Sequence, residues 1–193
     1  MLSGTYNVAL IVDGKAIDTK PLRVAADPEV VLTSVERKRL YDMAMEMHEL
    51  QRRATETATG FGTLNRETTA LATTIAGRSD VPADVKASFE AFHKEVTALA
   101  PKLAAPAGGR GFGGGGGRGA GAPDNILTKV GQAKNGLMGG IWPTEQTMRA
   151  YNEAKVDVPK QIVEGNALFA KAAAMGATLA KYNLTLTAPA AVK

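Results

Sequence analysis

A run of apolar residues spaced alternately three and four positions apart constrains the fold of this chain more than any other feature. The run comprises Leu40, Met43, Met47, Leu50, Ala54, Thr57, Phe61, Leu64, Thr68, Leu71 and Ile75. Such a heptad seam predicts one long helix packed lengthwise against antiparallel or coiled-coil-like neighbours. A capping box, Thr33 with Glu36, marks its start. Because Gly60 and Gly62 are poor helix formers, we expect a bend near Phe61.

Three further helices are predicted after the seam. The second begins in "SDVPADVK" with Asp80 as the expected cap, and the third opens at Asp124. The fourth, capped by Thr144, runs to about Tyr182, with a kink expected at Pro159 because proline removes an amide donor. Hydrophobic residues make up 45% of the chain and aromatic residues only 5%, which favours closely packed helices rich in Ala and Leu.

The predicted fold is therefore mainly α, an antiparallel bundle of about four long helices with a β-hairpin at its N-terminus. The expected organisation follows the composition along the chain. It consists of a hairpin over 1–28, a helical hairpin over 33–105, a Gly-rich flexible linker over 106–123, a second helical pair over 124–183 and an extended tail over 184–193.

The N-terminal segment alternates between apolar and polar residues, as a half-buried strand does. The apolar positions of its first strand are Tyr6, Val8, Leu10 and Val12. Asp13-Gly14 then predicts a type I′ turn, in which both central residues have positive φ. The alternation changes parity between Ile17 and Leu22, so we expect a β-bulge near Lys20-Pro21.

A two-stranded ribbon alone is marginally stable in water, so this hairpin needs more sheet or a helix to cover it. The segment resembles the last two strands of an immunoglobulin-like sandwich, with Tyr6 where such domains place a corner tyrosine. Either the hairpin packs against the helices of this chain, or it is the remnant of a sandwich in a longer protein. We favour the longer protein.

The Gly-rich segment is bounded by Pro106 and Pro123, and its large side chains are Arg110, Phe112 and Arg118. It contains no Arg-Gly-Gly triplet, and no Gly-Lys-Ser/Thr ends it as in a nucleotide loop. The net charge is only +4, and Lys and Arg are interleaved with Asp and Glu along the chain. Nucleic acid is therefore an unexpected partner. The alternative left open is a free-standing helical adaptor that binds nucleic acid weakly through Arg110, Phe112 and Arg118.

Catalytic motifs are not found in the sequence. It has no Cys and no Gly-x-Ser-x-Gly elbow, and "MHELQRR" around His48 lacks the second histidine of a zinc motif. We expect no catalytic residue, cofactor or metal, and a structural role for His48 and His93. The possible interaction residues are Trp142, expected to plug the turn before the fourth helix, and Met45, which lies outside the seam, together with Phe112, Arg110 and Arg118.

Three segments in combination carry a family resemblance: "DGKAIDTKPLRVAADPEV", "ERKRLYDMAMEMHELQRRATE" and "LTKVGQAKNGLMGGIWPTEQTMRAYNEA". They resemble the C-terminal region of large exported bacterial proteins with sortilin-like, BNR-type β-propeller repeats, often labelled glycosyl hydrolases. In that family an immunoglobulin-like segment precedes a long helical region with a Pro-Thr turn like Pro143-Thr144. The chain departs from the family because it has no propeller repeat and no Asp-box motif.

The resemblance implies a non-catalytic, C-terminal structural or interaction module of a larger exported protein. The expected partners are the upstream domains of the same polypeptide or another protein. A second alternative is a fragment of a glycosyl hydrolase whose active site lies upstream. The first ten residues lack the features of a signal peptide, and no run of about 18 apolar residues could span a bilayer.

Overall fold

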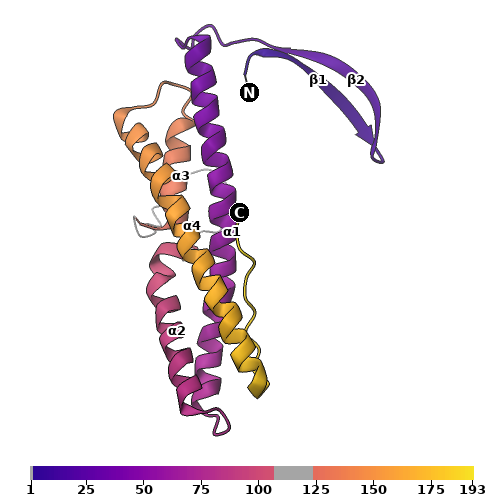
Figure 1. Ribbon diagram of the computed structural model, residues 1–193. Coiled ribbons are helices and arrows are strands. Elements are labelled where there is room, and N and C mark those ends of the chain that lie inside the picture. The colour runs from indigo at the N-terminus through magenta and orange to yellow at the C-terminus, as the bar shows by residue number, and fades with distance from the viewer. Residues whose placement is uncertain (1, 107–123) are drawn as a thin grey trace.

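The computed structural model describes residues 2–106 and 124–193, and it confirms a mainly helical fold with an N-terminal hairpin (Figure 1). The hairpin consists of β1 (Gly4–Val12) and β2 (Lys15–Val24). The helices are α1 (Ser34–Ala76), α2 (Ala83–Leu103), α3 (Ile126–Leu137) and α4 (Glu145–Leu179), and a short 3-10 turn, η1 (Ala180–Tyr182), follows.

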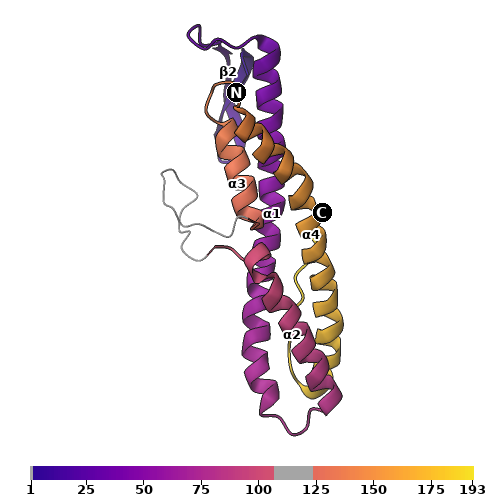
Figure 2. The same ribbon diagram turned by 90° about the vertical axis from the view of Figure 1, so that its left-hand side faces the viewer.

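The four helices form a bundle in which a cross-section contains three helices. α1 and α4 run parallel and contact each other, while α2 and α3 lie end to end alongside them in the opposite direction (Figures 1 and 2). α2 packs beside the half of α1 that is far from the hairpin, and α3 beside the near half. The described residues therefore form an up-down-up bundle whose middle helix is divided in two.

The predicted seam is the core-facing stripe of α1. All of its residues from Met43 to Ile75 are buried except Leu71, and Leu71 and Leu40 are half-buried against the same core. The two polar seam positions, Thr57 and Thr68, are fully buried because their hydroxyls donate to backbone carbonyls of their own helix. A Cβ at Gly165 would lie 2.8 Å from the Thr57 methyl, so glycine there allows α4 to approach α1 closely.

Several expected helix boundaries are confirmed and others are corrected. Thr33 and Glu36 form the capping box, and Thr144 accepts from the Thr147 amide at the start of α4. α2, in contrast, begins after Pro82 without a side-chain cap, because the Asp80 carboxylate is bonded to Arg78 instead. α1 and α4 each continue without a break, α1 through its internal glycines and α4 through its internal proline.

The residues after η1 form no helix or strand. They turn back at the end of α4 and run along the bundle, so that the C-terminal end of the chain lies beside its middle (Figure 1). Among the described residues, no helix combines the length and the apolar character that crossing a membrane requires.

Candidate interaction surface

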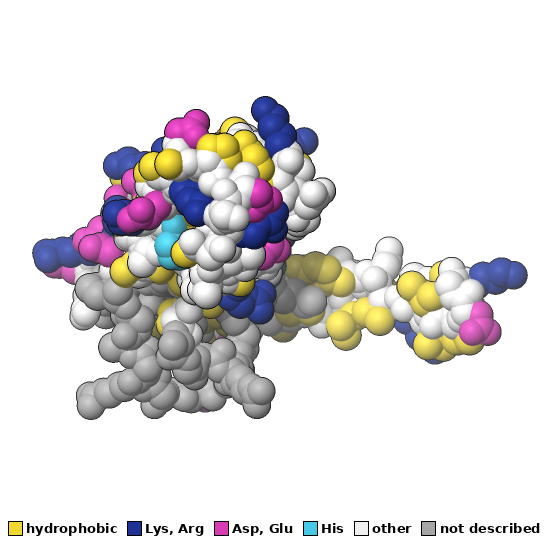
Figure 3. Space-filling view, turned by 90° about the horizontal axis from the view of Figure 1, so that it is seen from below, with side chains coloured by type: hydrophobic (Ala, Val, Ile, Leu, Met, Phe, Trp, Pro, Cys, Tyr) yellow, Lys and Arg dark blue, Asp and Glu magenta, His cyan; other side chains and the backbone are white. Residues whose placement is uncertain are grey.

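The hairpin stands clear of the helical bundle, and nearly every one of its residues is exposed (Figure 3). Asp13 and Gly14 have φ of 50° and 78°, which confirms the predicted type I′ turn. The predicted bulge near Lys20-Pro21 is wrong, because Pro21 pairs in regular register opposite Asn7. The register shift lies beside the turn, where Ile17 is left as the additional residue. The two-residue turn sets the residue pairs next to it, Val12 with Lys15 and Ile11 with Ala16. The extra residue therefore follows directly after these pairs.

One face of the hairpin is apolar near its base. Residues directly opposite each other in an antiparallel pair point to the same side, and successive residues alternate between sides. The pairing therefore places one set of side chains on a common surface, here called the apolar face: Tyr6, Val8, Leu10, Val12, Leu22 and Val24. Val8, Leu10 and Leu22 are 53%, 58% and 50% exposed. Nearer the turn, Lys20 and Asp18 pair with each other on the same side.

Tyr6 is fixed at the base of the hairpin. Its hydroxyl donates to the carbonyl oxygen of Leu2, four residues upstream, over 2.7 Å. A tyrosine near the start of a strand that bonds to backbone a few residues upstream is the arrangement of a tyrosine corner. The bond holds the residues before β1 against the strand.

A clamp formed by Arg37 holds the connection that follows the hairpin against the start of α1. Its guanidinium donates to the carbonyl oxygens of Asp27, Val30 and Leu32, at 3.1, 2.7 and 3.0 Å. Beside it, the capping box lowers the pKa of Glu36 through hydrogen bonds from Thr33. Three charge-assisted bonds thus fix the short segment that joins β2 to α1. Sequence reasoning missed this clamp, because nothing in the sequence pattern indicates that an Arg in the first turn of a helix bonds to backbone carbonyls of the preceding segment.

A cavity of about 390 Å³ lies where the hairpin base meets the bundle. Its walls come from the residues before β1, the 25–32 connection, the start of α1 and the end of α3. Most of the lining is aliphatic, including Leu2, Leu40 and Met138, and the Arg37 head is already bonded to carbonyls. The cavity therefore continues the apolar character of the hairpin toward the bundle.

The two interaction candidates that the structure describes lie at the same end of the molecule. Trp142 is 38% exposed in the turn between α3 and α4, and the guanidinium of Arg39 lies 5.6 Å from the centre of its ring. Met45 is 47% exposed on α1. No described contact brings Met45 and Trp142 together. The other three candidates, Arg110, Phe112 and Arg118, lie outside the described residues, as does the Gly-rich linker over 107–123.

A cluster of titratable side chains joins α1 to α4. Glu46 accepts a hydrogen bond from the Tyr151 hydroxyl. It also forms an ion pair with Lys155, in which Nζ lies 2.9 Å from Oε1. Burial and the Glu46 carboxylate raise the pKa of Tyr151. Burial opposes ionisation of Glu46, but the bonds from Tyr151 and Lys155 outweigh it and lower its pKa. The three groups satisfy one another and connect two helices of the core.

Histidine and carboxylate side chains do not converge elsewhere in the described part of the chain. No group of three or more potential metal ligands forms within it. The ring of His93 stacks on Phe89, and His48 lies 3.4 Å from the Lys134 ammonium. No protein family, curated protein or solved structure with which the chain was compared matches it.

Proposed function

We propose that this chain is a structural and interaction module whose hairpin supplies the last two strands of an immunoglobulin-like sandwich. The remaining strands would belong to the same, longer, exported polypeptide. The observation that carries the proposal is the apolar face, on which Val8, Leu10 and Leu22 are each half exposed or more. Fully burying one such side chain contributes about 1.5–3 kcal/mol, so a covering sheet would stabilise the hairpin substantially.

The two strands differ in a way that supports a specific direction of pairing. β1 contains no charged residue and no proline, whereas β2 contains Pro21 and four charged residues. Lys and Pro on a strand are typical of an edge that does not pair further. We therefore expect the free edge of β1 to pair with an incoming strand, and β2 to remain the outer edge.

The anchoring of the hairpin also supports docking of a rigid element. Tyr6 fixes the start of β1, and Arg37 fixes the segment that follows β2. A preorganised hairpin loses less conformational freedom on docking than a disordered one, so more of the burial energy remains for association.

The nucleotide sequence on the 5′ side of the Met1 codon gives the first test. The proposal expects an open reading frame that continues into a β-rich segment with the missing strands of the sandwich. An in-frame stop codon close upstream would contradict it.

Hydrogen exchange on the longer polypeptide gives the second test. The amides of β1 should exchange rapidly in the 193-residue chain and become protected in the longer polypeptide. Leu10→Glu, on the apolar face, should abolish that protection because it buries a charge. Ile11→Glu is the matched control, since Ile11 is 64% exposed on the opposite face. Equal effects of the two variants would contradict the proposal.

In this proposal the chain has no reaction of its own. Purified chain should hydrolyse no member of a polysaccharide panel, whatever activity belongs to the rest of the polypeptide. Turnover that copurifies with the chain and is lost in Glu46→Gln would contradict a purely structural role.

A further inference from the structure

The last ten residues of the chain occupy a groove between α1 and α4. We call Leu184–Lys193 the strap; Leu184 and Leu186 are buried where it begins. Helix side chains bond to the backbone further along. Asn166 of α4 donates to the Val192 carbonyl and accepts from the Val192 amide, both at 2.9 Å. Glu67 of α1 accepts from the Thr187 amide at 2.8 Å. The groove therefore contacts an extended backbone from both walls.

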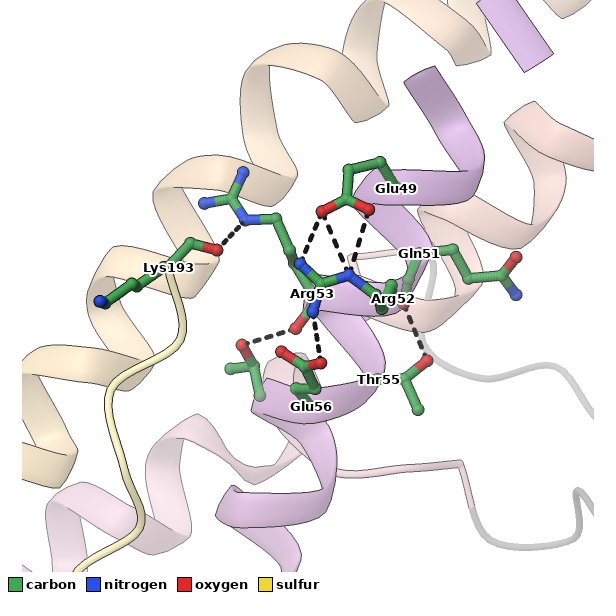
Figure 4. Close-up of polar contacts among 8 residues, drawn as sticks. Glu49, Gln51, Arg52, Arg53, Thr55, Glu56 and Lys193 are labelled. Carbon is green, nitrogen blue, oxygen red and sulfur yellow. Dashed lines mark hydrogen bonds and ion pairs between the residues drawn. The ribbon is translucent and has the colours of Figure 1, made fainter. Parts of the chain in front are cut away.

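Two glycines shape the floor of this groove. A Cβ at Gly60 would lie 3.0 Å from the Cβ of Pro189, and a Cβ at Gly176 would lie 2.7 Å from the Leu186 carbonyl oxygen. At its far end, the strap accepts a bond from Arg53 to the backbone oxygen of Lys193 at 2.7 Å (Figure 4). Polar side chains of α1 and α4 thus bond to the strap, and glycines on both helices leave room for it.

The outer part of the strap is held by polar contacts and by partial burial. From Thr187 to Lys193 every residue is exposed or half-buried. A hollow of about 720 Å³ lies between this part and α1, lined by residues that include Arg52, Thr59 and Gly60. Ala188 and Val192 of this part also pack against the core, and Leu184 and Leu186 are buried before it, so a strap that leaves its groove must bury these side chains again elsewhere.

Asn183 reverses the chain between α4 and the strap. Its φ is 54°, in the left-handed region that is unfavourable for residues other than glycine, although asparagine tolerates it better than most. Together with the bond from the Leu184 amide to the Leu179 carbonyl at 3.2 Å, this conformation makes the strap run back along α4. With Asn183 in the extended conformation, the strap would continue past the end of α4, away from its own bundle.

We propose that the α1–α4 groove is an interaction surface for the strap of a second copy of this chain. A second bundle placed end to end and inverted presents its own groove to the extended strap in the correct direction. Each strap then makes the same contacts in its partner that it makes in its own bundle. The exchange is reciprocal, so the assembly closes as a two-fold dimer and leaves no groove empty. This inference is independent of the function proposed for the hairpin.

Variants of Asn183 test the proposal, because monomer and dimer differ chiefly in the conformation of this residue. Light scattering after size exclusion, from micromolar to millimolar chain, should show a dimer that increases with concentration. Asn183→Val, which disfavours the left-handed turn, should raise the association constant about tenfold or more. Asn183→Gly, which favours the turn, should lower it. Wild-type chain that remains monomeric at every concentration would overturn the proposal.

Engineered cysteines test whether the dimer forms through the groove, since the natural sequence contains no Cys. Gly60→Cys and Pro189→Cys are made in separate chains and mixed under mild oxidation. The Cβ–Cβ separation at this contact, 3.0 Å, is shorter than the range of about 3.5–4.5 Å in disulfides, so a small outward shift of the strap brings the two cysteines to bonding distance. The two chains should form a mixed disulfide in high yield.

Gly62→Cys is the matched control on α1, because nothing lies within 4 Å of a Cβ at that position. It should form the mixed disulfide with Pro189→Cys only at background level. A dimer that gives equal yields with the two α1 cysteines would assemble through another surface, such as the hairpin, and would overturn the exchange of straps.

Discussion

The side-chain nitrogen of Asn125 lies 2.7 Å from the carbonyl oxygen of Ala104, which bonds the first turn of α3 to the last turn of α2. The same nitrogen donates to the Pro101 carbonyl at 3.1 Å, and the side-chain oxygen accepts from the amides of Leu127 and Thr128. One side chain, only 2% exposed, thus satisfies backbone groups at the ends of both helices. The two short helices are thereby aligned as one interrupted helix.

Asn125→Asp should destabilise the bundle. The carboxylate can still accept from the α3 amides, but it cannot donate to the two α2 carbonyls, and its charge would face their oxygens. We expect a loss of about 1–3 kcal/mol of unfolding free energy, measured by urea denaturation. Asn152→Asp, at an exposed position of α4, is the control and should change stability little. An unchanged midpoint for Asn125→Asp would show that the α2 bonds contribute nothing.

Removing Gly108–Gly121 should leave the helical fold intact and raise its stability. The deletion shortens the connection between Ala104 and Asn125 from 20 to 6 residues, and those two residues are already in contact. Loop-closure entropy predicts a gain of about 1 kcal/mol. Circular dichroism and urea denaturation measure the result. A fall in helical content would mean that the segment contributes to packing.

Tyr151→Phe should reduce stability at neutral pH by about 1 kcal/mol, because Glu46 loses the bond from the buried hydroxyl. The folded state lowers the pKa of Glu46, so the bond contributes fully above its ordinary pKa of 4.5. That contribution is lost as pH falls through the lowered value. Urea midpoints of wild type and variant should therefore converge in acid. Tyr41→Phe, at an exposed position, is the control; a pH-independent difference for Tyr151→Phe would contradict the account.

Two glycine-to-alanine substitutions should have opposite effects. Gly62→Ala adds a Cβ to open space within α1 and should stabilise the chain by about 1 kcal/mol through helix propensity. Gly176→Ala places a Cβ 2.7 Å from the Leu186 carbonyl and should destabilise despite the same gain. Thermal unfolding of the two variants measures the difference. Equal stabilisation would show that the strap does not contact α4 closely in solution.

The seam on α1 could be predicted because its information is local. Spacing of three and four along one helix fixes which side is buried, and the residues from Met43 to Ile75 follow it. Gly60 shows the limit. Local propensity marks this glycine only as a poor helix former, whereas in the structure its missing side chain makes room for Pro189, 129 positions away. A contact at that separation leaves no periodic signal in the sequence.

The candidate interaction surface divides in the same way. The hairpin and its Asp13-Gly14 turn follow from alternation and turn chemistry. The bulge was misplaced because the parity change indicates an extra residue without locating it, and the turn geometry decides its position. The Arg37 clamp and the Glu46–Tyr151 contact depend on how separate elements meet, so no spacing along the chain could have identified them.

The Arg37 clamp ties the connection that follows β2 to the first turn of α1. At about 1.5 Å per residue, the 43 residues of α1 span roughly 65 Å, and the clamp lies in the first turn. Any sheet that the hairpin joins would therefore be followed along the chain by one long, continuous helix. The length of this helix would then set the distance between that sheet and the turn that joins α1 to α2.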